Sequence, residues 1–299
     1  MKARFLVFGF GERISRNLET KGFNSVILNL GMKKIIDPNF FRDPSLEAYL
    51  RADKENIVVF NDHACMEAYK GNAIENIFRS IEIVSKFPDQ VIVLKGTRGV
   101  VKLTLSPGGF YRLEDSDQTK GFKTFCQNVQ QAVNGDEALA AQIIKKGHLA
   151  DRHLDTSIEE ASNITEGIRL MGRSFQPGHL KALRRGEKLP IEVIDKIMRD
   201  ILLLTAFLFQ KHPDVLEMPQ ASQVRNTFTF RFAISTHLLG LRWISEGGPG
   251  NITRDKLRND VVDMVYVAYA TFFDGLLTRD KKMQQIYQEV CLFLEHIFS

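Results

Sequence analysis

The distribution of apolar positions along the chain predicts short strands toward both ends and helices between them. Runs of β-branched and other apolar residues, bounded by turn-forming residues, are typical of buried strands. We expect strands at 3–9, 25–28, 34–36, 56–60, 90–94 and 275–278. Strands that alternate with helices are typical of an α/β fold with a mostly parallel sheet.

Apolar residues recur every three or four positions through most of the remaining chain, which indicates amphipathic helices. We expect helices near 46–50, 64–85, 127–132, 137–146, 157–171, 191–209, 228–245, 253–272 and 281–298. Gly71 is expected to break the second of these helices in two, because glycine is unfavourable inside a helix. Glycines and prolines predict a loop or hairpin at 96–109 and a loop at 247–250.

This order of elements divides the chain into three parts. Residues 1–99 hold most of the strands, including an extra N-terminal βαβ-like segment. Residues 100–249 form a mainly helical insertion, and 250–299 add a helix, a strand and a closing helix to the first part. A length of 299 residues fits one elaborated domain with an insertion better than two large domains.

Composition narrows the function classes only slightly. Apolar residues make up 44% of the chain, and the formal net charge of +4 is compatible with a nucleic-acid partner without predicting one. The 3 cysteines contain no CxxC pair, which argues against a disulfide framework and a thiolate zinc site. No apolar run approaches the roughly 18 residues of a membrane span. We therefore expect a cytoplasmic protein without a membrane partner, and a homo-oligomer is left open.

Four acidic residues lie where α/β sheets place their functional sites, near the carboxyl ends of strands. Two directly follow predicted strands, one lies a helical turn beyond a strand, and one lies on the apolar helix near the C-terminus. These residues are Asp37, Asp280, Glu67 and Asp263. Converging carboxylates repel one another unless a cation is present, and oxygen ligands favour Mg²⁺ or Mn²⁺ over zinc. Asp260 shares a helix face with Asp263 and is a further candidate ligand.

Each of these acids also has an ordinary structural interpretation. Asp280 is suited to cap the closing helix, and Asp37 before a proline suits a turn. Asp260 suits the first turn of a helix, where a negative charge is favourable. Asp62 is a candidate cap for the helix that carries Glu67.

Three segments resemble PIN-domain nucleases. The segment 35–41, with Asp37 followed two places later by Asn39, is similar to the opening strand of that family. The segment 58–67 resembles its second acidic position. The segment 263–280 resembles its closing helix and strand, with the same Thr-x-Asp ending.

The resemblance implies a PIN-like three-layer α/β fold with a central, mostly parallel sheet, interrupted here by the helical insertion. It implies that the acidic residues bind Mg²⁺ or Mn²⁺ and that a metal-activated water hydrolyses phosphodiester bonds, in RNA more often than DNA. The implied ligands are Asp37, Glu67, Asp263 and Asp280. Asn39 and Thr278 would orient these carboxylates.

A group of basic residues in the helical block has two interpretations, a solvated helix face or a surface that contacts nucleic-acid phosphates. Its members include Arg173, Lys181, Arg184, Arg185 and Lys188.

Two other functions compete with a nuclease. The N-terminal strand, turn and helix around Gly9 and Gly11 resemble the start of a dinucleotide-binding unit, although the third glycine is absent and Asn29 stands where an acid is usual. The other alternative is a catalytically inactive PIN-like fold that serves as a binding module.

Overall fold

The computed structural model describes residues 31–105, 109–185, 187, 189–215, 217–247 and 253–297. The strands expected at 3–9 and 25–28 lie outside this part of the chain, as does the turn that contains Gly9 and Gly11. The residues that carry the dinucleotide-binding alternative thus lie outside the described part of the chain.

A four-stranded sheet organises the described residues, with strand order β3-β2-β1-β4 and parallel pairing throughout. Its strands are β1 (Lys33–Ile36), β2 (Ile57–Phe60), β3 (Val91–Val93) and β4 (Leu276–Leu277). The parallel α/β sheet and these four strands confirm the sequence-based prediction. Ile35 and Ile36 point to opposite faces of the sheet and both are fully buried, so helices cover both of its faces.

Parallel strands need long crossover connections, and helices or helical turns fill each of the connections here. The elements between β1 and β3 are η1 (Pro38–Phe40), α2 (Pro44–Ala52), α3 (Asp62–Tyr69), α4 (Ala73–Ile81), η2 (Val84–Lys86) and η3 (Pro88–Gln90). Gly71 has a φ of 84° and separates α3 from α4, which confirms the expected break.

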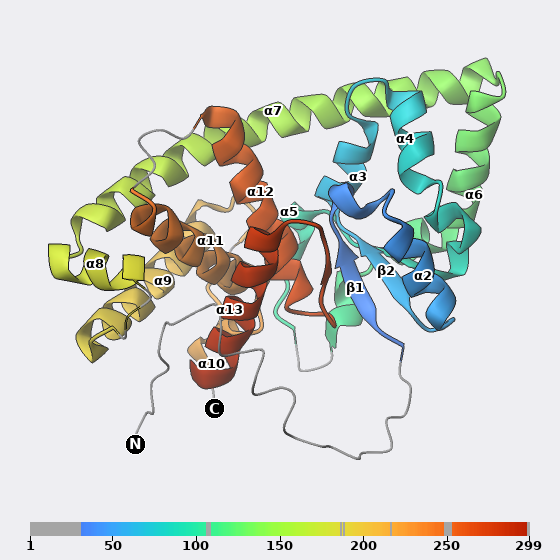
Figure 1. Ribbon diagram of the computed structural model, residues 1–299. Coiled ribbons are helices and arrows are strands. Elements are labelled where there is room, and N and C mark those ends of the chain that lie inside the picture. Colours follow the sequence, from blue (N-terminus) through green and yellow to red (C-terminus); the bar gives the residue numbers. More distant parts are fainter. Residues whose placement is uncertain are drawn as a thin grey trace, which may run out of the picture.

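Helices dominate the chain after β3 (Figure 1). In order they are α5 (Thr97–Val100), η4 (Gly109–Leu113), α6 (Ser116–Val133), α7 (Glu137–Arg173), α8 (Pro177–Arg185), α9 (Ile191–Lys211), α10 (Ala221–Val224), α11 (Phe228–Ser245), α12 (Arg254–Ala270) and α13 (Lys281–Ile297). None of the helices in the described ranges is long and apolar enough to cross a membrane.

Two boundaries in this block differ from the prediction. The helices expected at 137–146 and 157–171 are one continuous helix, α7, because the intervening residues contain no proline to end it. At 1.5 Å per residue this helix is about 55 Å long, and it spans the molecule in Figure 1. Helix α6 begins at Ser116, well before the expected 127, because Asp115 caps it by accepting a hydrogen bond from the Gln118 N–H.

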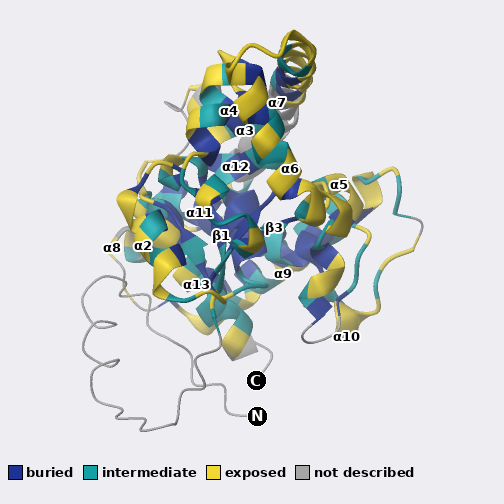
Figure 2. Ribbon diagram, turned by 90° about the vertical axis from the view of Figure 1, so that its right-hand side faces the viewer, coloured by how far each residue is buried: buried dark blue, intermediate teal, exposed yellow. Residues whose placement is uncertain are grey.

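The helical block and the sheet share one hydrophobic core, visible as the dark interior of Figure 2. Helix α11 is buried on nearly every side and packs against α7, α9, α12 and α13. Its Phe228 ring lies 4.5 Å from the ring of Tyr269 on α12, and α12 in turn packs against β1 and β4. The helical block therefore supports the helix that carries Asp263.

Two helical glycines differ in how closely other atoms approach them. A Cβ added at the buried Gly147 of α7 would lie 2.8 Å from the Cβ of Ala73 on α4. A Cβ added at Gly121 of α6 meets no atom within 4 Å. We expect Gly147→Ala to lower the free energy of unfolding by about 1–2 kcal/mol through overpacking. Gly121→Ala should raise it by about 0.5–1 kcal/mol, because alanine favours a helix.

Urea denaturation of both variants measures this difference. A gain in stability for Gly147→Ala equal to that for Gly121→Ala would contradict the close packing of α7 on α4.

Candidate functional site

Asp37 directly follows β1 and is held by β4, the neighbouring strand. Its backbone N–H donates to the Leu277 carbonyl at 3.0 Å, and the residue is only 6% exposed. The Thr278 hydroxyl donates to Oδ2 of Asp37, and the Asn39 backbone N–H donates to Oδ1 at 3.5 Å. The pairing of β1 with β4 thus brings together residues 241 positions apart in the chain.

Asn39 links the ends of the two strands. Its Nδ2 donates to Oγ1 of Thr278 at 3.3 Å, and its Oδ1 accepts from the Arg279 N–H at 3.0 Å. Arg279 also pairs through Nε with Asp43, the N-cap of α2, and this guanidinium holds the pKa of Asp43 down at about 2. These bonds fix the orientation of the Asp37 carboxylate, as the resemblance implies for Asn39 and Thr278.

Asp263 and Glu67 approach Asp37 from two helices. Asp263 lies on α12, which packs against β1 and β4, and Glu67 lies on α3, which packs against η1. Tyr266 follows Asp263 by one helical turn and is fully buried among these acids. The Tyr266 hydroxyl lies near Glu67 and lowers its pKa, but it forms no hydrogen bond of normal geometry.

The acidic side chains influence one another's protonation. Burial, together with the charges of Asp37 and Asp280 and against the opposing charge of Lys282, raises the pKa of Asp263 to about 8. Burial and the charge of Asp37 raise the pKa of Glu67 to about 7. Burial also raises the pKa of Asp37 itself, against hydrogen bonds from Thr278 and Asn39 that lower it. Asp37 thus interacts electrostatically with Glu67, Asp263 and Asp280, and we call these four acids the carboxylate cluster.

Asp280 fulfils its structural role as a helix cap as well as lying in this cluster. Its Oδ1 accepts from the backbone N–H groups of Lys282 at 2.7 Å and Met283 at 3.0 Å, in the first turn of α13. Its own N–H donates to Oγ1 of Thr278 at 3.0 Å. The capping bonds use only one carboxylate oxygen, so the other remains available to a ligand.

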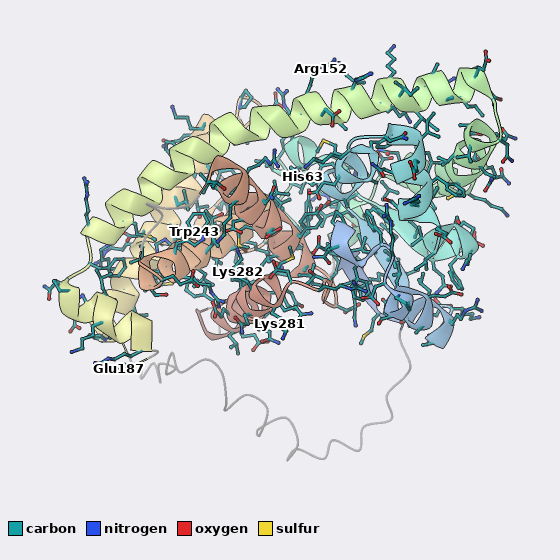
Figure 3. The ribbon with its side chains drawn as sticks, turned by 45° about the horizontal axis from the view of Figure 1, so that its top comes forward. His63, Arg152, Glu187, Trp243, Lys281 and Lys282 are labelled. Carbon is teal, nitrogen blue, oxygen red and sulfur yellow. The ribbon has the colours of Figure 1, made fainter. Side chains whose placement is uncertain are left out.

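Asp260 is occupied by other partners. Its Oδ1 accepts a charged hydrogen bond from Nζ of Lys282, and its Oδ2 accepts from the indole N–H of Trp243 at 3.0 Å. Trp243 comes from α11 and Lys282 from α13, and both side chains lie beside α12 (Figure 3). The geometry therefore gives Asp260 a structural role and does not support it as an additional metal ligand.

Asp62 does not cap α3. Asn61 is the N-cap, with its Oδ1 accepting from the Ala64 N–H at 2.7 Å. Asp62 instead accepts from both the N–H and the hydroxyl of Thr97, each at 2.7 Å, and that hydroxyl lies 3.1 Å from the Tyr269 hydroxyl. Asp62 therefore fastens the segment after β3 to α3 and α12.

The basic residues of the helical block lie apart from the carboxylate cluster. Helix α8 lies at the end of α7 that is farthest from the strands (Figure 1). Arg173 and Lys181 are exposed, and Arg185 pairs with Glu187 at 3.5 Å. Lys188 and the side chain of Arg184 lie outside the described part of the chain. A strand of nucleic acid would have to extend along the molecule to reach both regions.

Sequence reasoning missed two residues that shape the cluster, Tyr266 and Lys282. Tyr266 had a usable signal, because it follows Asp263 by three positions and so shares its helix face. Lys282 lies in a run of basic residues that resembles a solvated helix start. Only the packing of α13 against α12 shows that it pairs with Asp260.

The chemistry of the cluster suits a hard divalent cation, since its donors are carboxylate oxygens with a nearby threonine hydroxyl and asparagine amide. Within the described ranges, however, no three side chains of His, Cys, Asp or Glu are gathered so that they could hold a metal ion. The donors therefore fit Mg²⁺ or Mn²⁺ in kind, and a complete set of ligands would require their side chains to move closer together.

Comparisons of this chain with protein-family models, with curated proteins and with solved structures returned no match. The resemblance to PIN-domain nucleases thus rests on the segments 35–41, 58–67 and 263–280.

Asp263 should make the protein less stable at alkaline pH in the absence of divalent metal. Its pKa is raised from 3.8 to about 8 in the folded state, so the folded protein binds more protons between these values. Its contribution to stability is then fully present below about pH 4 and is lost as pH rises through 8. We expect Asp263→Asn to raise Tm at pH 8.5 by roughly 5 °C, corresponding to about 2 kcal/mol.

Thermal denaturation in EDTA across pH 4–8.5 provides the measurement, with convergence of the two proteins expected near pH 4. A variant that is less stable than the wild type at pH 8.5 would show that Asp263 is not strained by its surroundings.

Neutralising Asp260, one turn before Asp263 on α12, should lower the stability of the protein. Asp260 and Lys282 have side chains 7% and 26% exposed, so Asp260→Asn leaves a largely buried ammonium without its charged partner. We expect a loss of about 2–4 kcal/mol in the free energy of unfolding. Asp214→Asn is the matched control, because Asp214 pairs with Arg98, whose side chain is 73% exposed, and should cost less than about 1 kcal/mol. Equal losses in urea denaturation would refute a structural role for Asp260.

Proposed function

We propose that this protein is a divalent-metal-dependent nuclease that hydrolyses phosphodiester bonds through its carboxylate cluster. The observation that carries the proposal is the electrostatic influence between Asp37, at the carboxyl end of β1, and three acids from α3, α12 and the turn before α13. The preference for RNA over DNA, and the assignment to a PIN-like fold, come from the resemblance in sequence.

Gathering these acids opposes folding, which favours a functional explanation. Like charges in a poorly solvated place raise one another's pKa, and a buried carboxylate without a partner is unfavourable. Lys282 is a cation that acts on Asp263, and it is already paired with Asp260. A divalent cation would neutralise the cluster and convert this repulsion into binding energy.

Asp37 and Asp263 would hold Mg²⁺ or Mn²⁺, with Glu67 and the free oxygen of Asp280 completing the set. The bound cation would supply an activated water and stabilise the charge that develops on the phosphate. Thr278 and Asn39 keep the Asp37 carboxylate in one orientation. Without metal the pKa of Glu67 is about 7, so a cation that binds this carboxylate near neutral pH would displace a proton from it.

Cleavage of labelled RNA and DNA in Mg²⁺, Mn²⁺ and EDTA tests the proposal. We expect metal-dependent cleavage by the wild type and a reduction by roughly 100-fold or more in Asp37→Asn and Asp263→Asn, since each removes a charge that holds the cation. Asp89→Asn is the control, because Asp89 is an exposed acid in η3, before β3, and should cleave normally.

Asp280→Asn separates the two roles of that residue. Asparagine caps a helix about as well as aspartate, so the variant keeps the bonds to α13 and loses only the charge. Loss of cleavage at an unchanged Tm would assign Asp280 to the metal site, and normal cleavage would assign it to capping alone.

A wild-type protein that cleaves neither substrate and gains no thermal stability from Mn²⁺ would overturn the proposal. Metal-independent binding of nucleic acid, without cleavage, would favour the inactive binding module instead.

A further inference from the structure

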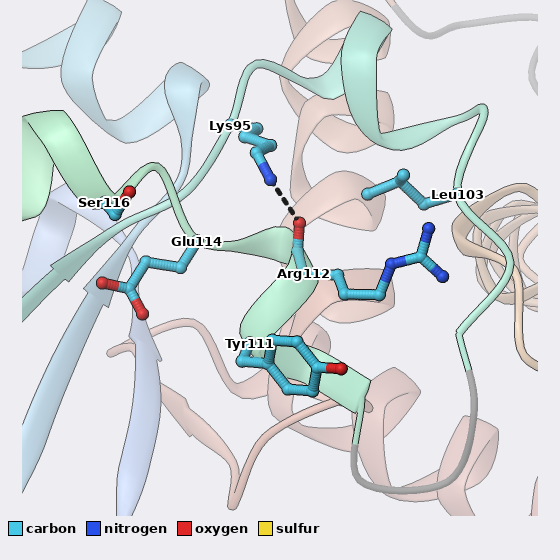
Figure 4. Close-up of a pocket in the computed structure, with 6 residues that line it drawn as sticks. All are labelled: Lys95, Leu103, Tyr111, Arg112, Glu114 and Ser116. Atoms are coloured by element: carbon cyan, nitrogen blue, oxygen red, sulfur yellow. Dashed lines mark hydrogen bonds between the residues drawn. The ribbon is translucent and has the colours of Figure 1, made fainter.

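A cavity of about 490 Å³ that is open to solvent lies beside β3, apart from the carboxylates described above. Its lining residues combine basic, aromatic, apolar and hydroxyl groups (Figure 4). They are Lys95, Leu103, Tyr111, Arg112, Glu114 and Ser116. Cavities of roughly 300–1,000 Å³ with a few placed polar groups are the usual size for small-ligand sites.

Backbone hydrogen bonds fix the walls of this cavity. β3 is an edge strand, and the segment after η4 pairs with its end in antiparallel fashion, with Leu94 opposite Glu114. The Lys95 N–H donates to the Leu113 carbonyl and the Asp115 N–H donates to the Val93 carbonyl, both at 2.8 Å. The cavity is therefore built on the sheet and does not depend on surface side chains alone.

Its two basic side chains are held in position by carbonyl oxygens. Nζ of Lys95 donates to the Arg112 carbonyl at 2.8 Å, and Nη1 of Arg112 donates to the Thr104 carbonyl at 2.9 Å. The Glu114 carboxylate extends toward the side opposite the Arg112 guanidinium (Figure 4). The remaining N–H groups of both cations can therefore bind an anion, and a planar guanidinium is well suited to phosphate oxygens.

Tyr111 supplies an aromatic surface next to these cations. The residue is 67% exposed, so its ring is accessible to a ligand. Its ring lies below the Arg112 side chain in Figure 4, and Leu103 adds an apolar wall above the guanidinium. Flat rings, including nucleic-acid bases, stack on exposed tyrosines of this kind.

We propose that this cavity binds a nucleoside phosphate, with its phosphate on Arg112 and Lys95 and its base against Tyr111. Glu114 and Ser116 lie at the other end of the cavity, where they can bond to sugar hydroxyls or to an amino group of the base. The same chemistry is present in a free nucleotide and in the phosphorylated end of a nucleic-acid strand. The proposal does not depend on catalysis by the carboxylate cluster.

Binding measurements in EDTA test the cavity without interference from metal-dependent cleavage. The probes are AMP, GMP, ATP, inorganic phosphate, and one oligonucleotide prepared with either a 5′-phosphate or a 5′-hydroxyl. We expect a nucleotide or the 5′-phosphorylated strand to bind more tightly than inorganic phosphate, because only they contact Tyr111. Saturation by the free nucleotides identifies them as the ligand, and preference for the 5′-phosphorylated over the 5′-hydroxyl strand identifies a strand end.

Variants of exposed side chains locate the binding. Arg112→Gln and Tyr111→Ala should each weaken binding by roughly tenfold or more, whereas Tyr111→Phe keeps the ring and should bind nearly as well as the wild type. Lys54→Gln is the matched control, because Lys54 is exposed in the turn before β2 and should not change affinity.

Failure of all nucleotide probes to bind, or equal affinity in Arg112→Gln, Tyr111→Ala and wild type, would overturn the proposal. Equal binding of the two strands, with no binding of free nucleotides, would overturn it as well. A protein that cleaves RNA but gives either result would lose this inference and keep the proposed function.

Discussion

The pairing of β1 with β4 is the contact on which the rest of the structure depends. β4 contains only Leu276 and Leu277, so its few backbone bonds cannot offset the entropy of closing a loop of more than 200 residues. The helical block supplies the missing stabilisation. Helix α11 buries itself against α12, and α12 packs against both strands, which positions β4 beside β1. A region that looked like an insertion in sequence is thus part of what assembles the sheet edge.

The same pairing concentrates unfavourable charge at one place. Asp37 and Asp263 are brought together with little solvent, and the raised pKa of each reflects that cost. Helix α12 carries two acids, one turn apart, that have different neighbours. Asp260 has Lys282 and Trp243 as partners, while Asp263 has mainly other acids around it. Native proteins keep such strained groups chiefly where binding or chemistry requires them.

The strands and most helices could be predicted from the sequence because short β-branched runs and helical spacing are local signals. The capping role of Asp280 was also local, since it depends on the residues that directly follow it. The partners of Asp260 could not be predicted, because Trp243 and Lys282 come from other helices and meet it only after packing. The cavity beside β3 was equally hidden. Arg112 and Tyr111 lie just after a segment that reads as a loop, and their positions depend on backbone pairing with an edge strand.

The cap at the start of α13 couples the first turn of this helix to the end of β1. The carboxylate of Asp280 holds the first amide groups of the last helix, while Thr278 and Asn39 join the same turn to β1. A cation bound to the other oxygen of this carboxylate would draw electron density away from the capping bonds. Binding of the proposed cation would then be thermodynamically linked to fraying of the terminal helix, and the backbone amides of Lys282 and Met283 are natural reporters for hydrogen exchange.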